Sequence, residues 1–150
     1  MDASPNPPLN SPPNPIAQRL GYLALLPFVF GALMVWFVRA DVRGYTAAAL
    51  SAYAAVVVAF LGGIHWGFGM RQDAPAARLF AWGVAPPLAA CVALLMQAPA
   101  GLVIHGAMLI ACYVVDRKVY PAQGAAGWLT LRFRLGAVAS LSCFLGAAGS

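Results

Sequence analysis

The chain has 150 residues, of which 62% are hydrophobic and only 9% are charged. Soluble domains carry about 25% charged residues, so this composition excludes a water-exposed globular fold and makes lipid the main solvent. The net charge of +5 comes without a basic patch interleaved with exposed aromatic residues, which argues against nucleic acid as a partner. The sequence therefore predicts an all-α, polytopic membrane helix bundle in a lipid bilayer.

Residues 1–17 are predicted to be a disordered, proline-rich tail, and residues 18–150 a single transmembrane helical domain. Apolar runs of membrane-spanning length then predict about five transmembrane helices. These lie near residues 20–38, 45–70, 78–96, 101–115 and 129–148. Pro27 falls inside the first span and predicts a kink there, and Pro86-Pro87 predicts another in the third.

Small residues recur every four positions in the second span, which predicts a helix-packing face along one side of that helix. This face consists of Ala55, Ala59, Gly63 and Gly67. His65 lies about 200° around the helix from Gly63 and points away from the face. Gly62 and Gly69 flank His65 on its own side and are expected to leave space beside the imidazole.

The distribution of basic residues predicts that the N-terminus is inside and the C-terminus outside, because positive charge gathers on the inner side of a membrane. With that orientation, seven basic residues fall on inner segments and only two on outer segments. The inner ones are Arg19, Arg71, Arg78, Arg117, Lys118, Arg132 and Arg134, and the outer ones are Arg39 and Arg43.

This orientation places His65, Asp116, Arg132 and Trp66 at one inner-leaflet level, as a candidate polar layer. Ionisable groups within a span are costly unless paired, so they are functional candidates by default. One interpretation is a network that holds helices together; the other is a proton relay, a substrate site or a lipid-headgroup site. His105 falls near the outer end of the fourth span and is expected to reach the interface or to be hydrogen-bonded.

Enzyme chemistry has little support in the sequence. The chain has no carboxylate cluster or His-Glu-x-x-His pattern for a metal, no nucleophile elbow and no phosphate loop. We therefore expect no cofactor, no metal and no catalytic residues.

The second span reads Phe-Leu-Gly-Gly-Ile-His-Trp-Gly over residues 60–67, and it resembles the signature of the domain-of-unknown-function 3429 family, related to transmembrane protein 69. The segment from Trp82 to Pro86, Asp116-Arg117 and Leu131-Arg132 are similar to later motifs of that family. The resemblance covers roughly residues 20–146. It implies an integral protein of the bacterial inner membrane, or alternatively of the mitochondrial inner membrane, with no established activity.

Two functions follow as hypotheses. The first is a structural, interaction or assembly role, in which a membrane-protein partner or a second copy of the chain packs on the small-residue face. The second is a small transporter or a lipid- or quinone-binding protein that uses the polar layer of His65, Asp116 and Arg132 beside the Pro86-Pro87 kink. The second hypothesis predicts a cavity that reaches this layer.

Overall fold

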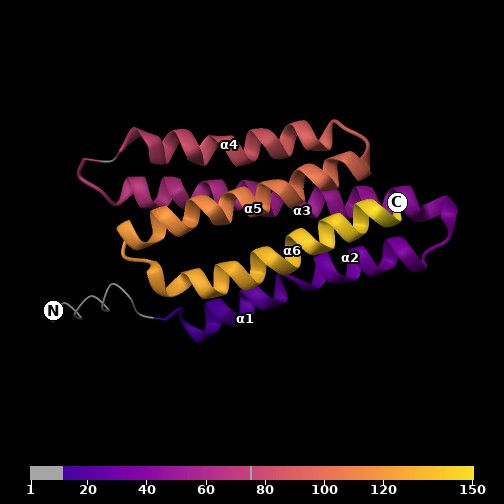
Figure 1. Ribbon diagram of the computed structural model, residues 1–150, viewed down its shortest axis with the longest axis horizontal. Coiled ribbons are helices and arrows are strands. Elements are labelled where there is room, and N and C mark those ends of the chain that lie inside the picture. Colours follow the sequence, from indigo (N-terminus) through magenta and orange to yellow (C-terminus); the bar gives the residue numbers. More distant parts are fainter. Residues whose placement is uncertain (1–11, 75) are drawn as a thin grey trace.

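The computed structural model describes residues 12–74 and 76–150, and this part of the chain is a bundle of long helices (Figure 1). The elements are α1 (Pro15–Leu23), α2 (Leu26–Phe37), α3 (Ala40–Met70), α4 (Ala77–Leu94), α5 (Ala98–Ala122), the 3₁₀ turn η1 (Ala126–Trp128) and α6 (Leu129–Gly149). Five helical segments are long and apolar enough to cross a membrane, with α1 and α2 together forming the first. The predicted all-helical, five-span architecture is confirmed, while the N-inside orientation stays a prediction.

The first span is broken rather than simply kinked. The helix stops after Leu23 and restarts at Leu26, with Pro27 in the first turn of α2. Proline lacks an N–H and its ring clashes with the carbonyl four residues earlier, so a break immediately before it is the expected outcome. The linking residues Ala24 and Leu25 keep a right-handed helical backbone, so α1 and α2 follow each other end to end as one span (Figure 1).

The start of α1 lies earlier than the boundary predicted after residue 17. Asn14 caps the helix by accepting a hydrogen bond from the Ile16 N–H at 2.8 Å, and Pro15 occupies the first helical position, where no donor is needed. The last residues of the predicted tail are thus helical. The rest of that prediction, over residues 1–11, lies outside the described residues.

α5 is longer than the predicted fourth span of residues 101–115, because it continues to Ala122. Asp116 was expected at the end of the helix but lies inside it, 1% exposed. A buried aspartate is tolerated there because Arg132 of α6 neutralises it. The helix ends at Ala122, and Gly124, two residues later, has a φ of 70°, a conformation that other residues rarely adopt.

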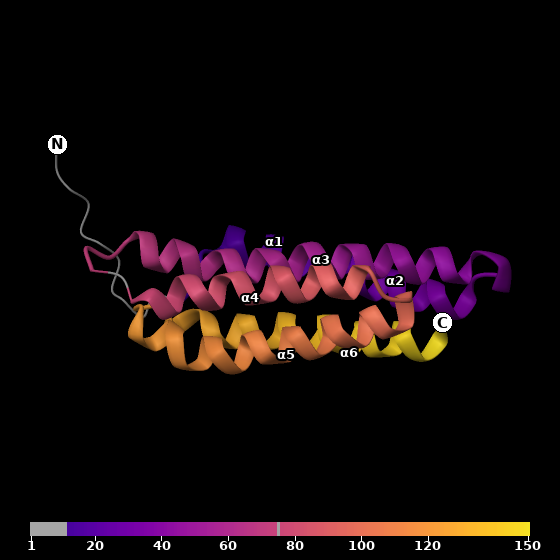
Figure 2. The same cartoon turned by 90° about the horizontal axis from the view of Figure 1, so that it is seen from above.

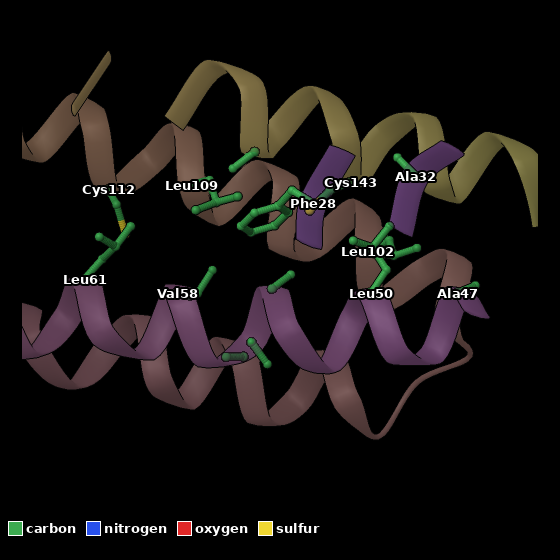
Figure 3. Packing of buried hydrophobic residues seen from close by; sticks show 14 of the residues in the cluster. Phe28, Ala32, Ala47, Leu50, Val58, Leu61, Leu102, Leu109, Cys112 and Cys143 are labelled. Carbon is green, nitrogen blue, oxygen red and sulfur yellow. The ribbon is translucent and has the colours of Figure 1, made fainter. Parts of the chain in front are cut away.

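α3 is the central helix and packs against α2, α4, α5 and α6. Because short turns reverse the chain after α3 and again after α4, α3 and α5 run in the same direction (Figure 2). Figure 3 shows their register, with Leu50 facing Leu102 at one end of the core and Leu61 facing Cys112 at the other. One turn beyond this second pair, the same register brings residue 65 beside residue 116.

Glycines allow α3 and α4 to pack closely against each other. A Cβ on Gly62 would lie 2.4 Å from the Gly83 carbonyl oxygen, and one on Gly69 would lie 2.7 Å from the Phe80 ring. The expectation that Gly62 and Gly69 leave space beside His65 is therefore wrong, because the backbone of α4 and the Phe80 ring occupy that space. Only hydrogen fits at these positions, so α4 approaches α3 closely.

Candidate functional site

Three buried side chains from three helices meet near one end of the bundle, where the α3–α4 and α5–α6 loops lie. We call this end the loop end. Arg132 of α6 donates two hydrogen bonds to one oxygen of Asp116, Oδ2, and the bond from Nε is 2.9 Å long. The other oxygen, Oδ1, lies 3.4 Å from His65 Nε2 of α3. His65 and Asp116 are each 1% exposed and Arg132 is 9% exposed, so the charges are shielded from solvent. We call these three residues the polar layer.

Two atoms of the polar layer, His65 Nε2 and Asp116 Oδ1, face each other without a hydrogen between them to share. His65 Nδ1 donates to the Leu61 carbonyl oxygen at 3.3 Å, since that oxygen can only accept. Both His65 Nε2 and Asp116 Oδ1 are buried without a hydrogen bond within the described part of the chain. In a neutral imidazole protonated on Nδ1, Nε2 is an acceptor, and it then faces the acceptor oxygen of a carboxylate.

Aromatic rings wall the His65 side of the layer. Trp82 of α4 and Phe68 of α3 meet the imidazole edge-on, with ring centroids 6.5 Å and 6.3 Å away. Tyr120 of α5 packs in turn on Phe68. Trp66, which was placed in the layer by level alone, faces α4: its indole N–H donates to the Phe80 carbonyl oxygen, and it is 39% exposed.

A groove of about 1000 Å³ opens beside the layer, between α1 on one side and α3, α5 and α6 on the other. Leu20 of α1 and Phe60 of α3 line it and are 59% and 68% exposed, so its mouth faces the surroundings of the bundle. Inside a bilayer those surroundings are lipid chains. α1 packs against α6, where Gly21 contacts Leu135, and it leaves the groove open between itself and α3.

The groove is apolar at one end and polar at the other. Its mid-bundle end is lined by apolar side chains such as Phe28, Leu109 and Ala139, and its loop end by Arg71, Tyr120, Gln123 and Arg132. No acidic residue of the described chain lines it. Asp116 takes Nε and Nη2 of Arg132, and the Tyr120 hydroxyl, which also lines the groove, lies close to the same guanidinium.

One further prediction about this region is wrong, and it concerns His105. The groove reaches the polar layer from the side away from Pro86-Pro87, since α4 contributes none of the described residues that line it. His105 does not reach the interface or find a hydrogen bond: it is 0% exposed, and neither ring nitrogen has a partner in the part of the chain the structure describes.

Sequence reasoning missed Tyr120 and Gly136 as groove residues. Both could have been found from helical spacing, because Tyr120 lies four residues after Asp116 and Gly136 four after Arg132, each on the same helix face. Gly136 is buried, yet a Cβ placed there would meet nothing within 4 Å. It faces the open volume of the groove.

The small-residue face divides into two halves. Ala55 lies in the core, whereas Gly63 and Gly67 are exposed and a Cβ on either would meet no described atom within 4 Å. The half of this face that carries Gly63 and Gly67 is therefore uncovered by the described part of the chain.

Comparison with known proteins gives one match. Residues 13–148 match the model of a family described as "Protein of unknown function (DUF3429)". Neither a curated protein nor a solved structure matches the chain. The relation to transmembrane protein 69 stays a prediction.

Proposed function

Because the chain belongs to the DUF3429 family of proteins of unknown function, its role has to be inferred from its own site, and we propose that it binds a lipid-like amphiphile in the groove. The five candidate spans make it an integral membrane protein. A bacterial inner membrane, or alternatively a mitochondrial one, is the proposed location. The ligand would enter sideways from the bilayer, with its chain along the apolar end and its headgroup at the polar end.

The observation that carries this proposal is the connection between the groove and the polar layer. Ligand sites commonly have volumes of about 300–1000 Å³ and are mostly apolar with a few placed polar groups. This groove has a volume of about 1000 Å³ and ends at a nine-tenths-buried arginine, Arg132. An arginine held in place by a carboxylate is preorganised to receive an oxygen acceptor.

The proposal is tested with a long-chain fatty acid that carries a photoreactive diazirine on its chain, added to the protein in phosphatidylcholine nanodiscs. We expect labelling to map by mass spectrometry to α1, α3 and α6 residues of the groove, such as Leu20, Phe60 and Gly136. The decisive variant is Gly136→Leu, which fills the groove without a clash at Cβ. It is expected to lower labelling at least about tenfold, since it removes the apolar volume a chain needs.

The matched control is Gly63→Leu, which adds the same side chain on the uncovered face of α3 and leaves the groove open. Its labelling is expected to equal that of the wild type. Equal labelling of the wild type and Gly136→Leu, or labelling spread over all lipid-facing residues alike, would contradict an amphiphile site in the groove.

A second candidate function is packing against a membrane-protein partner or a second copy of the chain. It is supported by the exposed Gly63 and Gly67, which would let another helix backbone come close. Cross-linking in nanodiscs tests the second-copy version. Gly63→Leu is expected to abolish a cross-linked dimer and Gly136→Leu to preserve it, the reverse of their effects on labelling. Recovery of a monomer alone from the wild type would count against self-association.

A further inference from the structure

The charge balance of the polar layer suggests what kind of headgroup the groove accepts. With His65 neutral, Asp116 and Arg132 cancel and the layer carries no net charge. An anionic headgroup on Arg132 would add one negative charge beside this neutral layer, and Arg71, the other cation that lines the groove, is exposed, so that solvent screens its charge. Uncompensated charges in a low-dielectric interior are strongly disfavoured, so something must compensate the charge of the headgroup.

The layer already contains the place for the compensating proton. His65 Nε2 and Asp116 Oδ1 face each other across 3.4 Å, both buried and both without a hydrogen bond within the described residues. A proton added to Nε2 turns this contact between two acceptors into a charge-assisted hydrogen bond. Without an anion in the groove, that proton would give the layer a net positive charge.

We propose that the groove takes up an amphiphile with a singly charged anionic headgroup together with one proton, and that the proton resides on His65. This rests on the proposed function and adds the charge of the ligand and its coupling to pH. The headgroup accepts from the Arg132 guanidinium, and a single carboxylate, Asp116, separates it from the imidazole.

No other nearby group takes the place of His65 in this coupling. On α5 the titratable residues on the Asp116 face are Cys112 and Tyr120, and on α6 the facing charge is Arg132. α4 presents Trp82, which does not titrate, and α3 presents the Leu61 carbonyl. Arg71, at the end of α3, also lines the groove, but as an exposed guanidinium that keeps its charge it takes up no proton. Among these groups, imidazole is the one that ordinarily changes charge between about pH 5 and 8.

The test uses amphiphiles whose own charge does not change with pH. Hexadecyl sulfonate, which stays anionic, and hexadecanol, which stays neutral, compete against the diazirine fatty acid in phosphatidylcholine nanodiscs from about pH 5.5 to about pH 8.5. At each pH the affinity of the diazirine fatty acid is measured separately, and the absolute affinity of each competitor is calculated from its displacement of that probe. Methanesulfonate provides the same anion without a chain.

The wild type is expected to bind hexadecyl sulfonate more weakly as pH rises. The affinity falls by up to about tenfold per pH unit where the empty site is unprotonated and the occupied site protonated. Hexadecanol is expected to show no such dependence. His65→Gln keeps an amide that can donate to Asp116 but cannot titrate, so it is expected to bind hexadecyl sulfonate with no pH dependence.

A pH-independent affinity of the wild type for hexadecyl sulfonate, or the same pH dependence in His65→Gln, would overturn the coupling while leaving an amphiphile site intact. If His65→Gln does not fold, His65→Asn takes its place. If neither variant folds, the wild-type contrast between sulfonate and alcohol decides alone. Binding of methanesulfonate as tightly as hexadecyl sulfonate would instead overturn the amphiphile itself. Competition by neither hexadecyl compound would overturn the proposed function.

Discussion

At the residue scale, the ion pair of Asp116 and Arg132 is the strongest polar contact in the described core. Both hydrogen bonds from Arg132 fall on one carboxylate oxygen, and both residues are at least nine-tenths buried. Such pairs contribute little net stability compared with apolar replacements, but removing one partner leaves a bare buried charge. A role in positioning Arg132 for a ligand explains why the pair is present better than stability does.

Asp116→Asn is expected to destabilise the protein by about 3–5 kcal/mol, because Arg132 then remains charged and uncompensated. The loss of stability is measured by thermal unfolding in detergent, monitored by size-exclusion chromatography. The double variant Asp116→Leu with Arg132→Met is expected to recover most of the loss. Arg134→Gln, which alters an exposed arginine two residues away, serves as the control; a similar loss there would show that the pair is not special.

His105 is a second residue-scale case, with the opposite expectation. Both of its ring nitrogens are buried without a partner among the described residues. An unsatisfied buried polar group costs about 1–3 kcal/mol, so His105→Leu is expected to raise the melting temperature in detergent. A drop of several degrees would mean that the imidazole has a bound water or another partner that leucine loses.

At the element scale, the contact between α3 and α4 depends on glycine at the crossing point. A Cβ on Gly83 would lie 2.2 Å from the Trp66 ring and 2.9 Å from the Gly62 carbonyl oxygen. Neither neighbour can yield freely, since Trp66 is tied by a hydrogen bond to Phe80 and the other is backbone. The crossing fixes α4 on α3, and with it the ring of Trp82 against His65.

Gly83→Ala is accordingly expected to destabilise the bundle by about 1–3 kcal/mol, as overpacking does elsewhere. Gly63→Ala makes the same chemical change on the uncovered face and is expected to be neutral or slightly stabilising. Melting temperatures of the two variants in the same detergent provide the comparison. Equal melting temperatures would show that α4 shifts at no cost.

At the scale of the whole molecule, the polar layer lies near one end of the bundle, together with the loops around Gln72 and Gln123, whose side chains are joined at 2.6 Å. The positive-inside rule assigns this end to the inner leaflet. The proposed headgroup would then lie on the inner side, and the ligand chain would point toward the middle of the bilayer.

Cysteine labelling tests this orientation. On a Cys91→Ala background, Asp73→Cys is expected to resist an impermeant maleimide in intact cells or organelles, and Ser150→Cys to react. Cys112 and Cys143 are buried and do not interfere. Reaction of Asp73→Cys in sealed membranes would show that the topology is the opposite of the predicted one.

The sequence by itself determined the architecture and the identity of the polar residues. Spans of about 20 apolar residues in a chain with 9% charge leave membrane helices as the solution, because lipid cannot satisfy a backbone that does not satisfy itself. The levels of His65, Asp116 and Arg132 followed from helix rise and from the basic residues at the ends of the spans.

Only the tertiary structure decided what surrounds these residues. Whether Gly62 or Gly63 faces a neighbouring helix depends on how α4 rotates around α3, and helical periodicity does not fix that. The groove depends on which helix α1 packs against, and local sequence does not decide that. The same is true of the close contact without a hydrogen bond between His65 and Asp116, since this contact arises from the register of α3 against α5.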